Sequence, residues 1–250
     1  MPEPGGPLQH IDFVLYIAIE SRTECFRAKR KAARTGRMEW QLPVQKLEVG
    51  NIYIASPWLR ESKYDAKYKP ISSLSYIGAQ FRMPSVSILF PPLPVVEYTA
   101  STGKLVIDMS ETSLACIKFS AFQETILQSI LCHQAAWFGS EYSIEEIRSK
   151  YIPIYKDNFL ILHCPMTYQG ARGPPIYANG KWTYSEHDTH LKPGTRVRIA
   201  VKLHGISYLY SNAPPPINLL AEVPEGRQVA STWSGKSRVQ HKIMGIIVQG

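Results

Sequence analysis

The stretch RVRIAVKLHGISYLY, residues 196–210, is the clearest strand pattern in the sequence and indicates a long β-strand. Apolar side chains alternate with basic or small ones as far as residue 204, and this period of two is typical of a strand with one buried face. Gly205 interrupts the alternation, so we expect a bulge or bend there, of the kind that small barrels need at their corners. The side chains predicted to face the core are Val197, Ile199, Val201 and Leu203.

The opposite face of this strand is basic, and a closing strand over residues 239–248 adds another lysine. Oligonucleotide-binding barrels hold single strands with cations that track phosphates and with aromatic rings that stack on bases. The alternative is that the cations solubilise an exposed sheet face and the tyrosines complete the core. The candidate nucleic-acid-binding residues here are Arg196, Arg198, Lys202, Lys236, Arg238, Lys242, Trp182, Tyr184, Tyr208 and Tyr210.

The charge of the whole chain supports a polyanionic partner. Its 250 residues hold 28 Lys and Arg against 20 Asp and Glu, a formal net charge of +8. Two segments, 22–37 and 192–250, carry most of the excess. The first segment is predicted to contact phosphates, with a nuclear-targeting patch or a plain solvated segment as alternatives. Its candidate residues are Arg27, Lys29, Arg30, Lys31 and Arg34.

Composition excludes several classes of protein. With 44% hydrophobic and 19% charged residues, the chain has enough apolar material for a sizeable core and is not expected to be disordered as a whole. It has no run of eighteen apolar residues, so we expect no membrane-spanning helix. The amino-terminal residues lack a secretory pattern, and four cysteines are too few for a disulfide scaffold. These features favour an intracellular protein.

Motifs for chemistry are sparse. The nucleotide-binding and hydrolase signatures GxxxxGK[ST], GxGxxG, GxSxG and HExxH do not occur in the sequence. The adjacent pairs Cys132-His133 and His163-Cys164 lack the spacing of a zinc site. We therefore expect no enzyme activity, no metal and no cofactor.

The rest of the chain predicts a mainly β protein of the α+β class. We expect strands at residues 13–19, 52–55 and 159–163, and a hairpin over 95–108. Capping-box patterns at Ser120 and Ser143 predict two short helices, and Asn179-Gly180 predicts a tight turn. The expected architecture is a small β-barrel, like an oligonucleotide-binding (OB) fold, with both helices packed on it. Residues 1–104 form an amino-terminal β-rich region whose role stays open, and it is either separate or part of the same domain as residues 105–250, the OB-like nucleic-acid-binding core.

One combination of residues consists of Gln123, Gln134, Trp137 and Phe138, the stretch 196–208 and Gln240. In this combination the chain resembles single-stranded DNA-binding proteins of large eukaryotic DNA viruses, which are related to the corresponding protein of podovirus phages. The resemblance covers roughly residues 105–248. The phage-type proteins end in an acidic tail, whereas this sequence has no acid after Glu225.

The resemblance implies an OB fold used in DNA replication or recombination. We expect the chain to bind single-stranded DNA without sequence specificity and to protect it, at a host nuclear or cytoplasmic replication site if it is viral. RNA is the alternative ligand to DNA. A single-strand-binding role would allow contacts with replication proteins and a homodimeric state. We expect no binding to membranes. The alternative functions are a structural or protein–protein interaction protein and, second, a nucleic-acid-processing enzyme.

Overall fold

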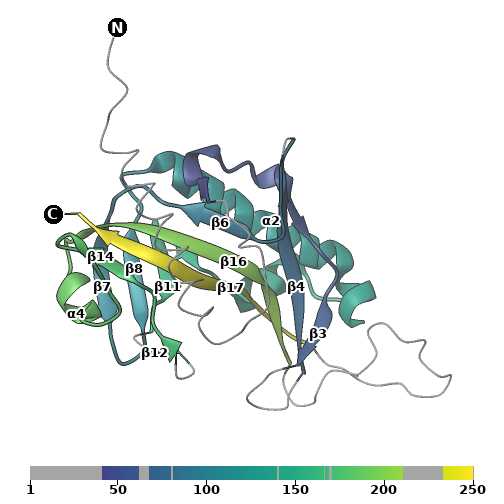
Figure 1. The fold of residues 1–250 in the computed structure, drawn as a ribbon. Helices are drawn as coiled ribbons and strands as arrows, with labels where there is room; N and C mark the ends of the chain where they lie inside the picture. The colour runs from purple at the N-terminus through teal and green to yellow at the C-terminus, as the bar shows by residue number, and fades with distance from the viewer. Residues whose placement is uncertain are drawn as a thin grey trace, which may run out of the picture.

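The computed structural model describes residues 41–61, 68–79, 81–139, 141–165, 167–168, 171–210 and 233–249 (Figure 1). Over these residues the protein is mainly β, with one large mixed sheet, a small two-stranded sheet, one long helix and several short ones. The predicted α+β class is therefore confirmed. The predicted strand at residues 13–19 and the basic segment 22–37 lie outside the described residues.

The elements run as follows. The helices are the 3-10 turns η1 (Val44–Lys46) and η2 (Val49–Asn51) and the α-helices α2 (Ser113–Phe138), α3 (Ile144–Lys150) and α4 (His187–His190). The strands are β1 (Leu42–Pro43), β2 (Ile52–Ile54), β3 (Trp58–Glu61), β4 (Tyr68–Ile77), β5 (Arg82–Met83), β6 (Val86–Leu89), β7 (Leu93–Thr99), β8 (Lys104–Asp108), β9 (Tyr151–Ile152), β10 (Tyr155–Lys156), β11 (Phe159–His163), β12 (Thr167–Tyr168), β13 (Ala171–Arg172), β14 (Ile176–Ala178), β15 (Lys181–Thr183), β16 (Arg196–Tyr210) and β17 (Trp233–Val248).

The two longest strands, β16 and β17, form the centre of the large sheet. They pair antiparallel from Val197 opposite Val248 to Tyr210 opposite Trp233. Along its other edge β16 pairs in turn with β7, β6 and β4, and β17 pairs with β14 and β9. Strands from both sides of residue 104 thus belong to one sheet (Figure 1).

Gly205 lies where β4 joins the edge of β16. The register of β16 and β17 shifts between Leu203 and Gly205, which confirms the predicted bulge. Gly205 is paired with Ser73, and a Cβ built on it would collide with the carbonyl oxygen of Ser72. The missing side chain therefore allows β4 to approach β16 at this position.

The helices differ from the prediction in length. The first helix, α2, begins at Ser113 and runs to Phe138, where Gly139 ends it in the left-handed conformation. The predicted cap Ser120 is therefore inside a long helix, because buried Ala115, Cys116 and Phe119 extend the apolar spacing upstream. The second helix begins as predicted, with a complete capping box between Ser143 and Glu146.

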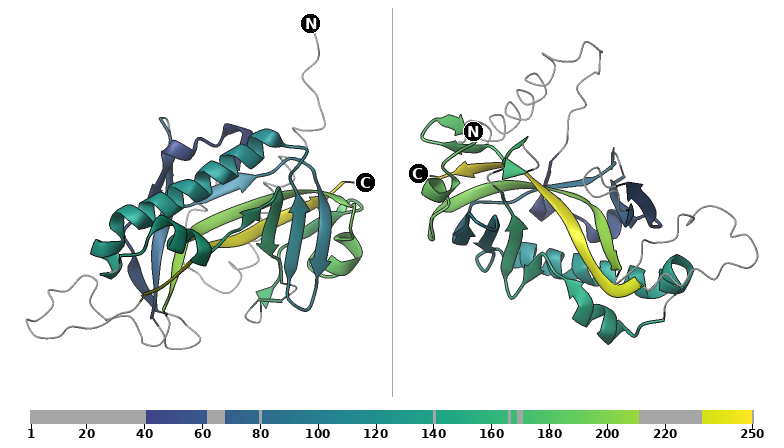
Figure 2. Two further views of the ribbon diagram at one scale, coloured as in Figure 1. Left: turned by 180° about the vertical axis from the view of Figure 1, so that it is seen from behind. Right: turned by 90° about the horizontal axis from the view of Figure 1, so that it is seen from below.

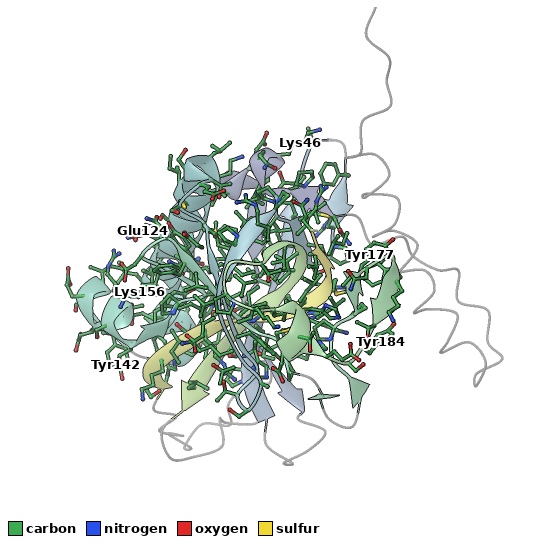
Figure 3. The ribbon with its side chains drawn as sticks, turned by 90° about the vertical axis from the view of Figure 1, so that its left-hand side faces the viewer. Lys46, Glu124, Tyr142, Lys156, Tyr177 and Tyr184 are labelled. Carbon is green, nitrogen blue, oxygen red and sulfur yellow. The ribbon has the colours of Figure 1, made fainter. Side chains whose placement is uncertain are left out.

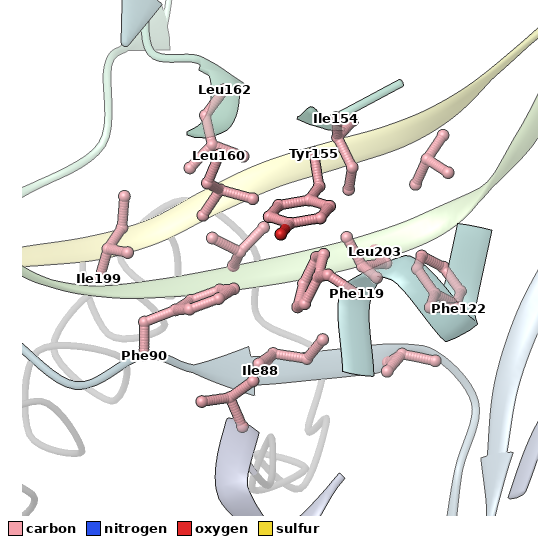
Figure 4. Close-up of a cluster of buried hydrophobic side chains, with 14 of the residues drawn as sticks. Ile88, Phe90, Phe119, Phe122, Ile154, Tyr155, Leu160, Leu162, Ile199 and Leu203 are labelled. Atoms are coloured by element: carbon pink, nitrogen blue, oxygen red, sulfur yellow. The ribbon is translucent and has the colours of Figure 1, made fainter. Parts of the chain in front are cut away.

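One face of the central strands packs on α2, which lies in front of them when the molecule is seen from behind (Figure 2, left). The side chains at the centre of this core come from β6, β11, β16 and α2, and the rings of Phe90 and Phe119 approach to 5.3 Å between centroids (Figure 4). The core face of β16 is the predicted one. Val197, Ile199, Val201 and Leu203 are each at most 2% exposed.

The sheet does not close into a barrel, so the predicted OB-like barrel is wrong. Strands β7, β8 and β11 curl around the core, and β11 approaches β17, but these two described strands form no ladder. Instead of bonding to a backbone carbonyl of β17, the His163 backbone N–H donates to the side-chain Nε2 of His241 at 2.8 Å. We call this unpaired boundary between β11 and β17 the seam.

A substitution at Gly205 tests the contact between β4 and β16. We expect Gly205→Ala to lower the free energy of unfolding by about 1–3 kcal/mol, because the added methyl group overpacks a backbone contact that cannot yield. Gly50→Ala is the control, since a Cβ there meets no atom within 4 Å. Urea unfolding measures both, and equal stability of the two variants would contradict the contact.

The buried imidazole of His241 at the seam leads us to predict that the free energy of unfolding depends on pH. Burial lowers the pKa of His241 from 6.5 to about 4, so its Nε2 stays an acceptor at neutral pH. Between pH 6.5 and 4 the unfolded chain binds a proton that the folded protein does not, so this contribution to stability is lost as pH falls. We expect His241→Gln, which keeps an acceptor but does not titrate, to weaken that fall in urea unfolding. His133→Gln, at an exposed histidine of α2, is the control, and an unchanged slope in His241→Gln would contradict the assignment.

Candidate nucleic-acid interface

The register of β16 and β17 brings several basic residues that were predicted to bind nucleic acid onto one face of the sheet. Lys202 stands directly opposite Lys242, and Arg238 stands opposite Ser207. Directly opposite residues of an antiparallel pair project to the same side, away from the core positions that alternate with them. We call this side the outer face. Lys236, Arg238 and Lys242 are exposed on it and Lys202 is half-buried.

Strand β4 continues the outer face beyond β16. Gly205 and Ser207 pair with Ser73 and Ile71 of β4, and the intervening Ser72 is fully buried. Gln240 lies opposite Gly205, and its amide donates to Ser207 Oγ at 2.6 Å. Polar side chains therefore connect the cations of β17 to the surface of β4.

Two exposed aromatic residues that the sequence reasoning missed lie on this extension. Trp58 of β3 pairs with Ile71, and Tyr53 of β2 pairs with Ser75, so both share the outward side of β4. Their exposed fractions are 42% and 55%. The indole N–H of Trp58 donates to Ser73 Oγ at 3.2 Å, which fixes the ring over the strand. The alternation Ile-Tyr-Ile at residues 52–54 is the signal that could have marked Tyr53 as outward.

The other end of the outer face is apolar. Ala200, Leu89 and Ile247 form a small buried cluster, against which Tyr177 and Trp182 pack with ring centroids 5.2 Å apart. The predicted base-stacking residue Trp182 is half-buried here, as is Tyr184. Figure 3 shows Tyr177 and Tyr184 on one flank, with Glu124 and Lys156 on the opposite flank.

Arg198 and Arg196, both predicted to contact phosphates, lie in surroundings that the sequence did not predict. Arg198 is only 8% exposed, since its position falls in the apolar part of the outer face, so it does not present its charge at the surface. Arg196 is exposed but forms a bidentate ion pair, with Nη2 2.7 Å from Glu111 Oε2 and Nη1 3.1 Å from Oε1. This pair lowers the pKa of Glu111. The charge of Arg196 is therefore neutralised between β16 and the start of α2.

Tyr208, predicted to stack on bases, lies in the core and not on the outer face. Because the bulge at Gly205 reverses the alternation, Tyr208 points into the core and is 1% exposed. Its ring lies 4.8 Å from Phe138 and 6.1 Å from Trp233 between centroids. Its hydroxyl shares a hydrogen bond of 2.9 Å with Ser72 Oγ. The side chain of Tyr210, like the cations Arg27, Lys29, Arg30, Lys31 and Arg34, lies outside what the structure describes.

The outer positions of the paired strands carry no Asp or Glu among the described side chains, so every charged side chain described there is basic. Within the same described residues, no group of three or more His, Cys, Asp or Glu is arranged to hold a metal ion. No α-helix in this part of the chain is both long and apolar enough to cross a bilayer. The outer face therefore combines basic side chains with two exposed aromatic rings.

The assignment of Tyr208 to the core is testable. We expect Tyr208→Phe to lower the free energy of unfolding by about 1 kcal/mol, because it removes a buried hydrogen bond to Ser72, and to leave nucleic-acid affinity unchanged. Tyr53→Phe, at an exposed ring, serves as the control for stability. A Tyr208→Phe protein as stable as wild type, with weakened binding, would place this ring in the interface instead.

Comparison with known proteins gives no relative, since no protein-family model, no curated protein and no solved structure matches this chain significantly. The candidate interface therefore depends on the geometry of its own residues.

Proposed function

We propose that this protein binds single-stranded nucleic acid, DNA in the first place, on the outer face of β16, β17 and β4. The observation that carries the proposal is the pairing of Lys202 with Lys242 beside Arg238, on the same face as the exposed ring of Trp58. Two cations directly opposite one another concentrate positive charge on this face. That charge would attract a phosphate chain lying over the strands.

The aromatic residues supply the second part of the proposed binding. Stacking of one base on an aromatic ring contributes about 1–3 kcal/mol, whatever the base. Trp58 is already oriented by its hydrogen bond to Ser73, so little side-chain entropy is lost when a base stacks on it. Tyr53 offers a second ring on the same side.

The proposed binding has low sequence preference, because phosphate contacts and stacking do not read the hydrogen-bonding edges of bases. Such binding suits a protein that protects single strands during replication or recombination, a role that the viral resemblance also implies. The proposal needs no closed barrel, since an open sheet face presents cations and rings equally well.

The proposal predicts a specific salt dependence. Four cations of the outer face, Lys202, Lys236, Arg238 and Lys242, would release counterions from about four phosphates, giving a slope of roughly −3 for log Kobs against log salt concentration. We expect Lys202→Ala/Lys242→Ala to bind a labelled thirty-nucleotide single strand about 25-fold more weakly at 0.1 M salt and to reduce the slope by about 1.4. Fluorescence anisotropy measures both quantities.

The matched control is Lys46→Ala/Lys156→Ala, which removes the same charge from exposed lysines that lie off the outer face. Its affinity should stay within about twofold of wild type. In the same assay, Trp58→Ala should lower the affinity for the strand about tenfold. Phe159→Ala, which removes an exposed ring of β11, should leave the affinity unchanged. No binding at low salt, or equal losses in the two lysine pairs, would overturn the proposal.

A further inference from the structure

The seam between β11 and β17 contains a slot of about 220 Å³. It exists because the sheet stops short of closing there, while residues 151–156 cross one end of the gap and pair with β17 and β11. Its lining residues are Thr102, Lys104, Ile152, Pro153, Ile154, Ile161, Leu162, His163, Arg238, Val239 and His241. None of these lining residues is acidic.

The walls and the mouth of the slot differ in chemistry. Ile152, Ile161 and Val239 belong to apolar walls, and buried Ile154 and Leu162 extend them inward. The low pKa of His241 keeps that imidazole neutral at neutral pH, so the wall carries no charge there. An apolar, flat ligand with a hydrogen-bonding edge would fit such walls.

Two cations stand at the mouth, and they are not equivalent. Lys104 Nζ is held 2.9 Å from Glu97 Oε2, so its charge is already compensated. Arg238 is exposed and paired in register with Ile152, which is 45% exposed at the mouth. Arg238 is therefore the residue placed to contact an anionic group of a ligand whose apolar part enters the slot.

The size of the slot limits the ligand. Pockets for drug-sized molecules span about 300–1,000 Å³, and this slot is smaller. One heterocyclic ring system with a phosphate left outside matches both the volume and the separation of apolar walls from a basic mouth. Arg238 also belongs to the outer face, where it lies opposite Ser207, so the slot opens beside the proposed path of the strand.

We propose that the slot takes one unstacked base of a bound single strand while Arg238 contacts the phosphate of the same nucleotide. This inference depends on the proposed function, and it adds a subsite that would hold one nucleotide of the strand more firmly than its neighbours. Bases already unpaired enter such a site at low cost, which favours single strands over duplex.

Methyl NMR of the isoleucines tests the slot directly. Ile152, Ile154 and Ile161 line it, whereas Ile126 and Ile199 are buried elsewhere in the core and serve as internal references. We expect thymidine monophosphate to shift the first three methyl signals through the ring current of the base. Inorganic phosphate alone should leave those signals largely unmoved. Addition of the thirty-nucleotide strand should shift the same signals.

A pair of variants gives the affinity test. Ile152→Glu places a carboxylate beside Arg238 at the mouth, while Ile117→Glu makes the same change at an exposed position of α2 outside the slot. We expect Ile152→Glu to weaken strand binding about tenfold, equivalent to about 1.4 kcal/mol, and Ile117→Glu to change it less than twofold. The exposure of both positions should preserve folding, which the dispersion of the methyl spectrum verifies.

The outcomes separate the two proposals. Strand binding by anisotropy without shifts of the three slot signals, or equal affinities of the two variants, would overturn the slot and leave the proposed function standing. Slot signals that move with thymidine monophosphate in a protein that binds no strand would support a nucleotide site and overturn strand binding. Absence of both effects would overturn both.

Discussion

The antiparallel ladder between β16 and β17 fixes the position of every other part of the large sheet. Strands β7, β6 and β4 take successive places along the free edge of β16, and β14 and β9 take theirs along β17. This arrangement depends on close backbone approach, since β4 begins to pair with β16 at Gly205, where a side chain would collide with the Ser72 carbonyl oxygen. The ladder thus sets which distant segments become neighbours, and with them the composition of each face.

The two faces of the ladder carry different kinds of side chain. Apolar side chains on the core face are removed from water against α2, which is the main favourable term for folding. On the outer face the same register places Lys202 opposite Lys242, which concentrates positive charge there. The proposed binding of a single strand depends on this charge and on the oriented, exposed ring of Trp58.

The seam shows how the same sheet ends. Strand edges leave backbone donors that must be satisfied, and the imidazole of His241 accepts one of them from His163 instead of a ladder carbonyl. Because the edges are held near each other without pairing, an apolar slot remains between them, with Arg238 at its mouth. The open sheet and the slot therefore have one origin, and they place the proposed base subsite next to the proposed phosphate path.

The sequence alone determined the local features: the strand at 196–204 with its core face, the bulge at Gly205, the turn at Asn179-Gly180 and the cap at Ser143. Each follows from residues a few positions apart. Tertiary structure alone decided which cations share a surface, because strand register and burial join segments far apart in the chain. Ser72 and Tyr208, 136 residues apart, share a hydrogen bond in the core. Glu111 and Arg196, 85 residues apart, form an ion pair. No local pattern carries such pairings, and for the same reason the open seam, the length of α2 and the exposure of Trp58 became visible only in the folded chain.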